Sequence, residues 1–229
     1  MNLDADILVQ VAITVGIFLL VGFPVHEFFH AFAAYRLGDN TARYMGRLTL
    51  DPRRHFDPIG GSMLAISAFL SQGSFAFGFA KPTPVNPINL DGGRRGEAIV
   101  AAAGPLSNLV MAGVASIVLR VVASLDGFPF SLMANPVTAL LWNIGFLFVV
   151  FNVVLFLFNL LPIPPLDGWR VLLGLVPPRT AFTLRSYEQY AMFALIIIVI
   201  FGGRIIGPVI GVALDFLLGD AQGLLPLRR

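Results

Sequence analysis

Long runs of apolar residues alternate along the chain with short polar stretches, and the runs have the length of membrane-spanning helices. Residues 7–25 contain no charged side chain, and about 20 apolar residues cross the hydrocarbon layer of a bilayer as a helix. We expect this first helix to continue to about Leu37. Residues 97–123 and 136–161 form two further runs of spanning length. The pattern therefore predicts several transmembrane helices.

The stretches between the first and second runs predict a polar loop, a re-entrant segment and an extended segment. Residues 36–58 are polar and contain five arginines, and within them residues 44–50 are expected to pair as short strands. Residues 59–80 are apolar but rich in Gly, Ser and Phe. Residues 81–87 contain three prolines, which exclude the interior of a helix.

The end of the chain predicts a helical hairpin over about residues 187–219, with Gly202 and Gly203 at its hinge. Each arm is short for a span, so one tilted helix is the alternative. Because no internal repeat or soluble appendage is evident, we predict one domain over residues 1–229 with its core at about 7–175. The expected fold is an all-α polytopic helical bundle of about five spans, with a re-entrant or short β segment near the active site.

The composition supports a membrane protein. Hydrophobic residues make up 57% of the chain and the mean hydropathy is +0.83. Charged residues make up 12%, whereas a soluble domain has about 25%. The net charge of +2 reflects arginines scattered between the apolar runs, which indicates membrane topology and not a nucleic-acid surface.

Two further features limit the chemistry and the processing of the chain. It contains no Cys, so disulfides and thiolate zinc sites are excluded and any metal must be held by His, Asp or Glu. The N-terminal flank carries Asp4 and Asp6 and no basic residue, whereas the first part of a secretory signal is positive. We therefore interpret the first run as a retained span.

The motif that carries chemistry is His26-Glu27-Phe28-Phe29-His30, at the end of the first span. Residues four apart lie on one face of a helix, so both imidazoles can reach one ion while Glu27 acts on a nearby water. The alternative is that this sequence matches the zinc-binding motif by chance and forms part of an ordinary core helix. A carboxylate deep in a membrane helix costs about 2.5–3.5 kcal/mol, and a bound divalent cation would offset that cost.

A catalytic zinc usually has three protein ligands, so a third is needed. The candidates are His55, Asp51, Asp57, Asp91, Glu97, Asp167 and Glu188. Most lie in polar loops, where a solvated charge is the simpler interpretation. Asp167 differs because it follows a helix that prolines break at membrane depth, and such backbone is tolerated where it lines a cavity or is buried in protein. Asp167 is either a ligand or the N-cap of a short helix over 167–175; a ligand is favoured.

Four motifs in order resemble the site-2 protease family of intramembrane metalloproteases. They are His26–His30, Gly104-Pro-Leu-Ser-Asn108, Asn159 to Gly168, and Phe77 to Pro87, which is similar to the family's Gly-x-Ala-Lys-Pro-Val-Pro-Val-Asn stretch with Thr83 in place of a common Val. The resemblance covers about residues 15–175 and includes neither a PDZ-like nor a nucleotide-binding module. It implies that His26, His30 and Asp167 bind one zinc and that Glu27 is the general base. It implies that Asn108 lies beside the site, and Asn108 and Asn159 are candidates to bind substrate or stabilise the oxyanion.

These features predict a zinc-dependent intramembrane endopeptidase. Its substrates would be single-span membrane proteins that unwind locally, and the extended region 74–87 could pair with them as an added strand; a passive loop is the alternative. A transporter and a non-catalytic metal-binding scaffold are the rival classes. A transporter predicts broken helices in an internal repeat, which is not seen, and a scaffold would be expected to lose Glu27 or a ligand.

Topology and charge agree on one arrangement. If the loop 36–58 is cytoplasmic and residues 59–80 dip in and return, Asp167 lies at the depth of His30 on the cytoplasmic side. That topology places further basic side chains in the cytoplasm: Lys81, Arg94, Arg95, Arg170, Arg179 and Arg185. With a terminal hairpin, Arg228 and Arg229 join them. We expect a multi-pass protein of the plasma membrane, with the lipid bilayer and substrate proteins as partners and no nucleic acid. The sequence leaves the oligomeric state open.

Overall fold

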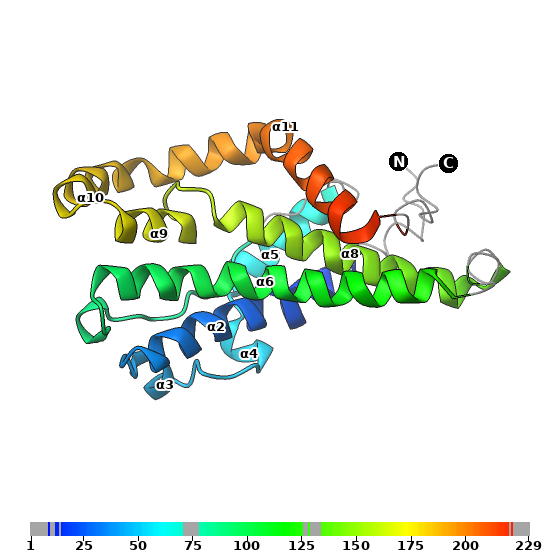
Figure 1. The fold of residues 1–229 in the computed structure, drawn as a ribbon, viewed down its shortest axis with the longest axis horizontal. Helices are drawn as coiled ribbons and strands as arrows, with labels where there is room; N and C mark the ends of the chain where they lie inside the picture. Colours follow the sequence, from blue (N-terminus) through cyan, green and yellow to red (C-terminus); the bar gives the residue numbers. More distant parts are fainter. Residues whose placement is uncertain are drawn as a thin grey trace. The chain divides into compact units, whose positions relative to one another are not determined.

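The computed structural model describes residues 9, 12, 13, 15–70, 78–125, 128, 134–219 and 221. These residues form helices joined by turns and extended segments, and they contain no β-strand (Figure 1). In chain order the elements are η1 (Phe18–Gly22), α2 (Phe23–Arg36), α3 (Thr41–Tyr44), α4 (Pro52–His55), α5 (Pro58–Leu70), η2 (Pro87–Asn89), α6 (Arg94–Ala123), α8 (Pro136–Asn159), α9 (Asp167–Leu175), α10 (Pro178–Arg185), η3 (Ser186–Tyr190) and α11 (Ala191–Leu218). The all-α class is confirmed.

Three described helices are long and apolar enough to cross a membrane, and they are the three expected runs: Val15–Arg36, Arg94–Ala123 and Pro136–Asn159. The third begins where the Asn135 side chain accepts a hydrogen bond from the Val137 amide, with Pro136 in the first turn. These are standard start signals of a helix. The total of about five spans stays a prediction.

One face of α6 exposes large apolar side chains that water would not favour. Val110, Val114, Ile117 and Val121 are 64%, 59%, 63% and 56% exposed, and their spacing of three or four residues places them on one side of the helix. Exposed apolar stripes of this length are expected where a helix faces lipid. The structure therefore fits the membrane interpretation of this run.

The predicted strands over residues 44–50 are wrong. Gly46 turns the chain with a φ of +68°, and the Arg47 amide bonds back to the Ala42 carbonyl. The His55 ring donates to the Thr49 carbonyl at 2.8 Å. Because turns and side chains satisfy this backbone, no ladder partner is needed.

The predicted terminal hairpin is also wrong, and the single helix that was its alternative is found. α11 runs without interruption from Ala191 to Leu218 and passes through Gly202, Gly203 and Pro208. A glycine costs a helix only about 1 kcal/mol, whereas a turn in an apolar setting leaves backbone groups unsatisfied. Part of the predicted re-entrant segment 59–80 lies outside the described residues. α5 ends at Leu70, and the description of the chain resumes at Gly78.

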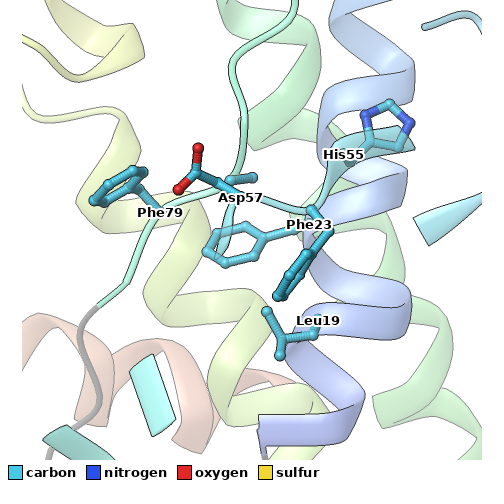
Figure 2. Close-up of a pocket in the computed structure, with 7 residues that line it drawn as sticks. Leu19, Phe23, His55, Asp57 and Phe79 are labelled. Carbon is cyan, nitrogen blue, oxygen red and sulfur yellow. The ribbon is translucent and has the colours of Figure 1, made fainter. Parts of the chain in front are cut away.

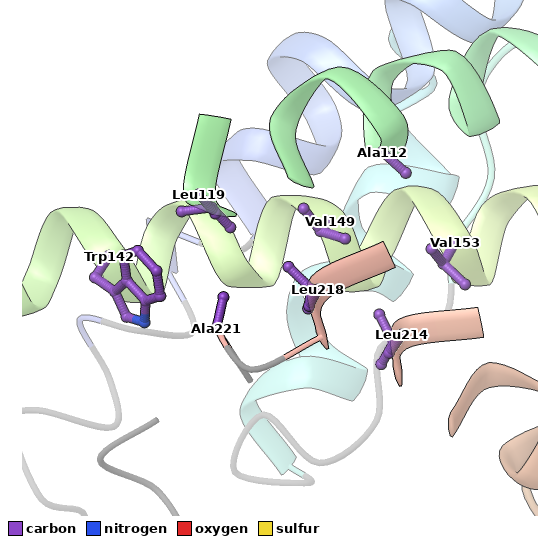
Figure 3. Packing of buried hydrophobic residues seen from close by; sticks show 8 residues of the cluster. All are labelled: Ala112, Leu119, Trp142, Val149, Val153, Leu214, Leu218 and Ala221. Carbon is purple, nitrogen blue, oxygen red and sulfur yellow. The ribbon is translucent and has the colours of Figure 1, made fainter. Parts of the chain in front are cut away.

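The chain forms two compact units. One comprises Met1–Ser107 and Arg170–Pro177, and the other comprises Asn108–Trp169 and Pro178–Arg229. In the first unit, Ala34, Leu90 and Val100 form a small buried cluster. In the second, α8 packs with α11 and the later part of α6 around a larger cluster (Figure 3): Ala112, Leu119, Trp142, Val149, Val153, Leu214, Leu218 and Ala221.

Within the first unit, a buried carboxylate joins the end of α2 to the segment that leads to α6. Asp39 is fully buried and accepts hydrogen bonds from Thr41, from the Asn86 amide at 2.7 Å and from the Asn89 side chain at 3.2 Å. Burial alone would raise the pKa of this carboxyl, but the hydrogen bonds together bring its pKa below the ordinary 3.8. The ionised form is therefore the stabilising one.

Replacing Asp39 with Asn should destabilise the protein at neutral pH by about 1–3 kcal/mol. The NH₂ group of the new side chain would face the groups of Thr41, Asn86 and Asn89 that now donate to the carboxylate, and these hydrogen bonds would be lost. The contribution of the wild-type carboxylate is fully present above pH 3.8 and is lost as the pH falls through its lower folded-state pKa. Thermal unfolding in detergent between pH 3 and pH 7 would measure both effects. Asp91→Asn, at an exposed side chain, is the matched control, and equal stability of the two variants at pH 7 would contradict the proposed role of Asp39.

Candidate metal centre and catalytic base

His26 and His30 lie one turn apart on α2 and are both buried, at 5% and 7% exposure. Their Nε2 atoms are 3.0 Å from each other. Two nitrogen ligands of a tetrahedral zinc are about 3.3 Å apart when each bond is about 2.0–2.1 Å long. The pair therefore needs only a small opening to hold one ion.

The backbone of α6 sets the orientation and the protonation of His30. Its Nδ1 lies 2.8 Å from the Val100 carbonyl oxygen. A carbonyl oxygen only accepts, so Nδ1 carries the proton and Nε2 of the neutral ring keeps its lone pair. A histidine that binds a metal through one ring nitrogen usually donates a hydrogen bond from the other, as Nδ1 of His30 does here.

The space in front of the two imidazoles exists because residue 104 is glycine. A Cβ built on Gly104 would overlap the His30 Nε2 and also press on the His26 Nε2. α6 therefore approaches α2 with bare backbone at the point where the two Nε2 atoms converge. This cradle, together with two imidazole nitrogens that can act as ligands, fits a zinc ion.

Glu27 is held by a segment from a distant part of the chain. Its Oε2 accepts a hydrogen bond of 2.8 Å from the Thr83 amide, and its carbonyl oxygen accepts one of 3.0 Å from the Thr83 hydroxyl. Thr83 lies in the proline-rich stretch that has no helix, as the sequence predicted. The carboxylate thus has a fixed direction beside the His pair.

The other candidate ligands have different partners. His55 is buried and bonds Thr49, Asp51 pairs with Arg53, and Asp57 accepts from the Ile59 and Gly60 amides at the start of α5. Glu188 accepts from the Trp169 ring. Among the described residues, none of these joins a group of side chains that could hold a metal. Asp167 begins α9, as predicted.

A small hollow lies beside this part of α2 (Figure 2). It is lined by Leu19, Phe23, His55, Phe56, Asp57, Phe79 and Ala80, and its volume of about 10 Å³ is very small. Phe23 precedes Glu27 by one helical turn, and Ala80 precedes Thr83 by three residues. Its walls are mainly apolar, and the His55 Nδ1 has no hydrogen-bond partner among the described residues.

Asn108 and Asn159 have structural partners. Asn108 is fully buried and donates to the Asn152 side chain at 2.9 Å, which links α6 to α8. Asn159 donates to the Leu155 carbonyl one turn earlier in α8. Asn108 therefore links two helices, while binding of substrate or oxyanion by either residue stays a prediction.

Comparison with known proteins identifies the family. The model of Peptidase family M50 matches residues 12–202. The chain belongs to this family, the site-2 proteases. This membership follows from a match over most of the sequence and agrees with the resemblance that the four motifs predicted.

Two relatives carry the name "Putative zinc metalloprotease". YwhC of Bacillus subtilis (strain 168) is 34% identical over 202 residues, which cover 87% of this chain and 87% of YwhC. Rip2 of Mycobacterium tuberculosis (strain ATCC 25618 / H37Rv) is 34% identical over 183 residues, which cover 78% of this chain and 63% of Rip2. No solved structure matches the chain significantly.

The family and the geometry together define a metalloprotease. The chain is a zinc metalloprotease of family M50 and an integral membrane protein, because its family is one of membrane proteases and three of its helices are long enough to span a bilayer. The His pair on α2 and the cradle at Gly104 provide the chemistry that zinc requires.

Sequence reasoning missed three residues of this region. Thr83 was noted only as a departure from the family pattern, and its bonds to Glu27 join residues 56 positions apart. Val100 contributes through its backbone, which no side-chain pattern reveals. Asn152 had a signal, because an amide side chain inside a 24-residue apolar helix often bonds a neighbouring helix.

Replacing Gly104 with Ala should weaken zinc binding by about tenfold or more, because the added methyl group displaces the two imidazoles. Gly113→Ala is the matched control, because Gly113 lies on the same helix and a Cβ at that position would meet no atom within 4 Å. Zinc affinity of the purified proteins, measured by competition with a chelator, would test this. Equal affinity of both variants, with unchanged helix content, would show that Gly104 does not shape the site.

Proposed function

We propose that this protein is an intramembrane endopeptidase that cuts membrane-spanning proteins, with one zinc held by His26, His30 and Asp167 and with Glu27 as the general base. The observation that carries the proposal is a buried His pair on a helix long enough to span the bilayer, in which the first His is followed in the sequence by Glu27, whose carboxylate Thr83 orients. Membership of a peptidase family supports hydrolysis as the reaction.

Asp167 as third ligand is supported by its chemistry and by its element. A carboxylate oxygen is a common zinc ligand beside histidine nitrogens, and the chain has no Cys that could serve instead. Asp167 is the first residue of α9, and the residues of α9 from Arg170 onward belong to the unit that contains both histidines. In that unit the Arg94 guanidinium donates to the Leu173 carbonyl at 3.0 Å, and Gly174 lies against Ala98. These contacts anchor α9 on the helix that orients His30.

The reaction divides between the metal and the protein. Zinc, when bound, lowers the pKa of water to about 7 and polarises a peptide carbonyl. His26 and His30 supply two neutral donors. Glu27 accepts a proton from the attacking water at the carboxylate oxygen that Thr83 leaves open, and then passes it to the leaving amine. Asn108 or Asn159 is our candidate to donate to the oxyanion.

The extended segment 78–86 is our candidate to hold the unwound substrate. The Lys81 amide donates to the His55 carbonyl and the Thr83 amide donates to Glu27, so both donors face the enzyme. In an extended chain the residues between them face the other way. The opposite edge therefore presents the Pro82 and Pro84 carbonyls, which can accept from an added strand. Residues 74–77 of the predicted pairing region lie outside the described residues.

We place the active site at the cytoplasmic side of the plasma membrane. The Asp91 amide donates to the Leu37 carbonyl at 2.7 Å, and Asn86 and Asn89 bond Asp39. These bonds support a common membrane side for the end of the first span and the start of α6, as expected if residues 59–80 dip in and return. Arginines concentrate in this region, which favours the cytoplasm. The proposed partners are single-span substrate proteins and the surrounding lipid.

Replacing Glu27 with Gln should reduce cleavage by at least about 100-fold while zinc stays bound, because Gln cannot move the proton. Membrane proteomes of cells that express the wild-type or the variant protein should differ by single-span proteins that remain uncut only with the variant. His26→Ala is the contrasting variant and should lose zinc as well. Substantial proteolysis by purified Glu27→Gln protein would exclude the base role.

Cysteine labelling would test the topology, because the chain has no native Cys. Tyr44 and Ile88 are 83% and 92% exposed, and a Cys at either position should react with a membrane-impermeant reagent only after cells are permeabilised. A Cys in place of Leu125, at the far end of α6 and 57% exposed, should react in intact cells. Labelling of Ile88→Cys from outside would overturn the proposed re-entrant path of residues 59–80.

A further inference from the structure

Thr83 makes two hydrogen bonds to one residue, and that residue is Glu27. Its amide donates to the carboxylate oxygen Oε2 at 2.8 Å, and its hydroxyl donates to the Glu27 carbonyl oxygen at 3.0 Å. The Thr83 side chain is buried, at 8% exposure. The contact therefore fixes both the side chain and the backbone of Glu27 relative to the extended segment.

The sequence around Thr83 makes it a rigid donor. Pro82 and Pro84 flank it, and a residue before proline is restricted to extended conformations. Both backbone polar groups of Lys81, two residues earlier, are also bonded. Its amide donates to the His55 carbonyl at 2.9 Å, and its carbonyl accepts from Arg47 at 3.5 Å. Little conformational freedom remains to be lost when the Thr83 amide holds the carboxylate.

We propose that Thr83 is the positioning residue of the catalytic base, an inference that rests on the role of Glu27 proposed above. By occupying Oε2, the Thr83 amide turns the other oxygen, Oε1, toward the reacting water. The hydroxyl bond holds the turn of α2 that carries Glu27. Because Thr83 belongs to the segment assigned to substrate pairing, a substrate strand docked there lies against the element that sets the direction of the base.

The two bonds respond differently to substitution. Thr83→Val keeps the amide and the shape of the side chain but removes the hydroxyl bond, and Val is the residue that the family pattern commonly has here. Thr83→Ser restores the hydroxyl. The amide bond is tested from the other partner, since Glu27→Gln keeps an acceptor oxygen and Glu27→Ala removes it.

The first experiment is hydrogen exchange followed by mass spectrometry, which needs no activity. Proline has no amide hydrogen, so Thr83 supplies the only exchangeable backbone hydrogen in the stretch 82–84. Exchange at Thr83 should be about tenfold faster in Glu27→Ala than in the wild type, because its acceptor is lost, and close to wild type in Glu27→Gln. Lys81, which bonds His55, is the internal control and should not change. Equal exchange at Thr83 in all three proteins would overturn the proposal.

The second experiment measures turnover of fluorescein-labelled casein, an unfolded protein that needs no helix unwinding. Thr83→Val should lower kcat about tenfold with KM and zinc content unchanged, because only the orientation of the base is affected, and Thr83→Ser should recover most of the loss. Thr183→Val, at an exposed threonine of α10, should have wild-type turnover.

The outcomes separate the two proposals. Wild-type kcat in Thr83→Val, in an enzyme that cleaves casein, would overturn the positioning role and leave the proposed function intact. A raised KM with unchanged kcat, or a loss of zinc that accounts for the whole fall in turnover, would assign Thr83 to the scaffold and overturn its positioning role. If no variant and no wild-type protein cleaves, the proposed function fails on this probe, and the exchange at Thr83 still decides whether the contact exists.

Discussion

The contact between bare backbone of α6 and the His face of α2 is the constraint on which the site depends. Val100 fixes the tautomer of His30 through its carbonyl oxygen, and one turn later Gly104 leaves the space into which both imidazoles project. A larger residue at 104 or a shift of α6 by a fraction of a turn would remove both effects together. Zinc chemistry in this chain therefore rests on close helix packing as much as on the ligands, as is common where small residues let membrane helices approach.

The extended segment after α5 brings a second, independent support to the same helix. Its donors bind His55, Glu27 and Asp39 in succession, so it follows α2 from the level of the base to the end of the helix. These bonds are local to one compact unit of the structure. Glu27, the proposed base, is thereby held by a chain segment that carries no proposed metal ligand, while α6 holds His30 on the same helix.

The sequence predicted what depends on local signals. The start of α8 followed from the apolar run that begins at residue 136, the start of α9 followed from the proline-rich break, and the His pair followed from helical spacing. The strands predicted for residues 44–50 from alternating apolar and polar residues are wrong. The Arg47 and His55 side chains donate to backbone carbonyls of this loop, which therefore do not bond to a neighbouring strand. The predicted hairpin also gave too much weight to Gly202 and Gly203, which a helix without competing water tolerates. The amide of Asn152 in an apolar helix signals a contact with another helix but does not name its partner Asn108. The bonds of Thr83 join positions 56 residues apart, and a single sequence holds no signal for such a pair.

The prolines that flank Thr83 also have a consequence for association between copies of the protein. A sheet edge normally presents donors and acceptors in alternation, which lets two identical edges pair with each other. Pro82 and Pro84 remove the donors from the outer edge of this segment. Two such edges would meet carbonyl against carbonyl and repel, so the segment stays open to a donor-bearing strand while being protected from self-pairing in the crowded plane of a membrane.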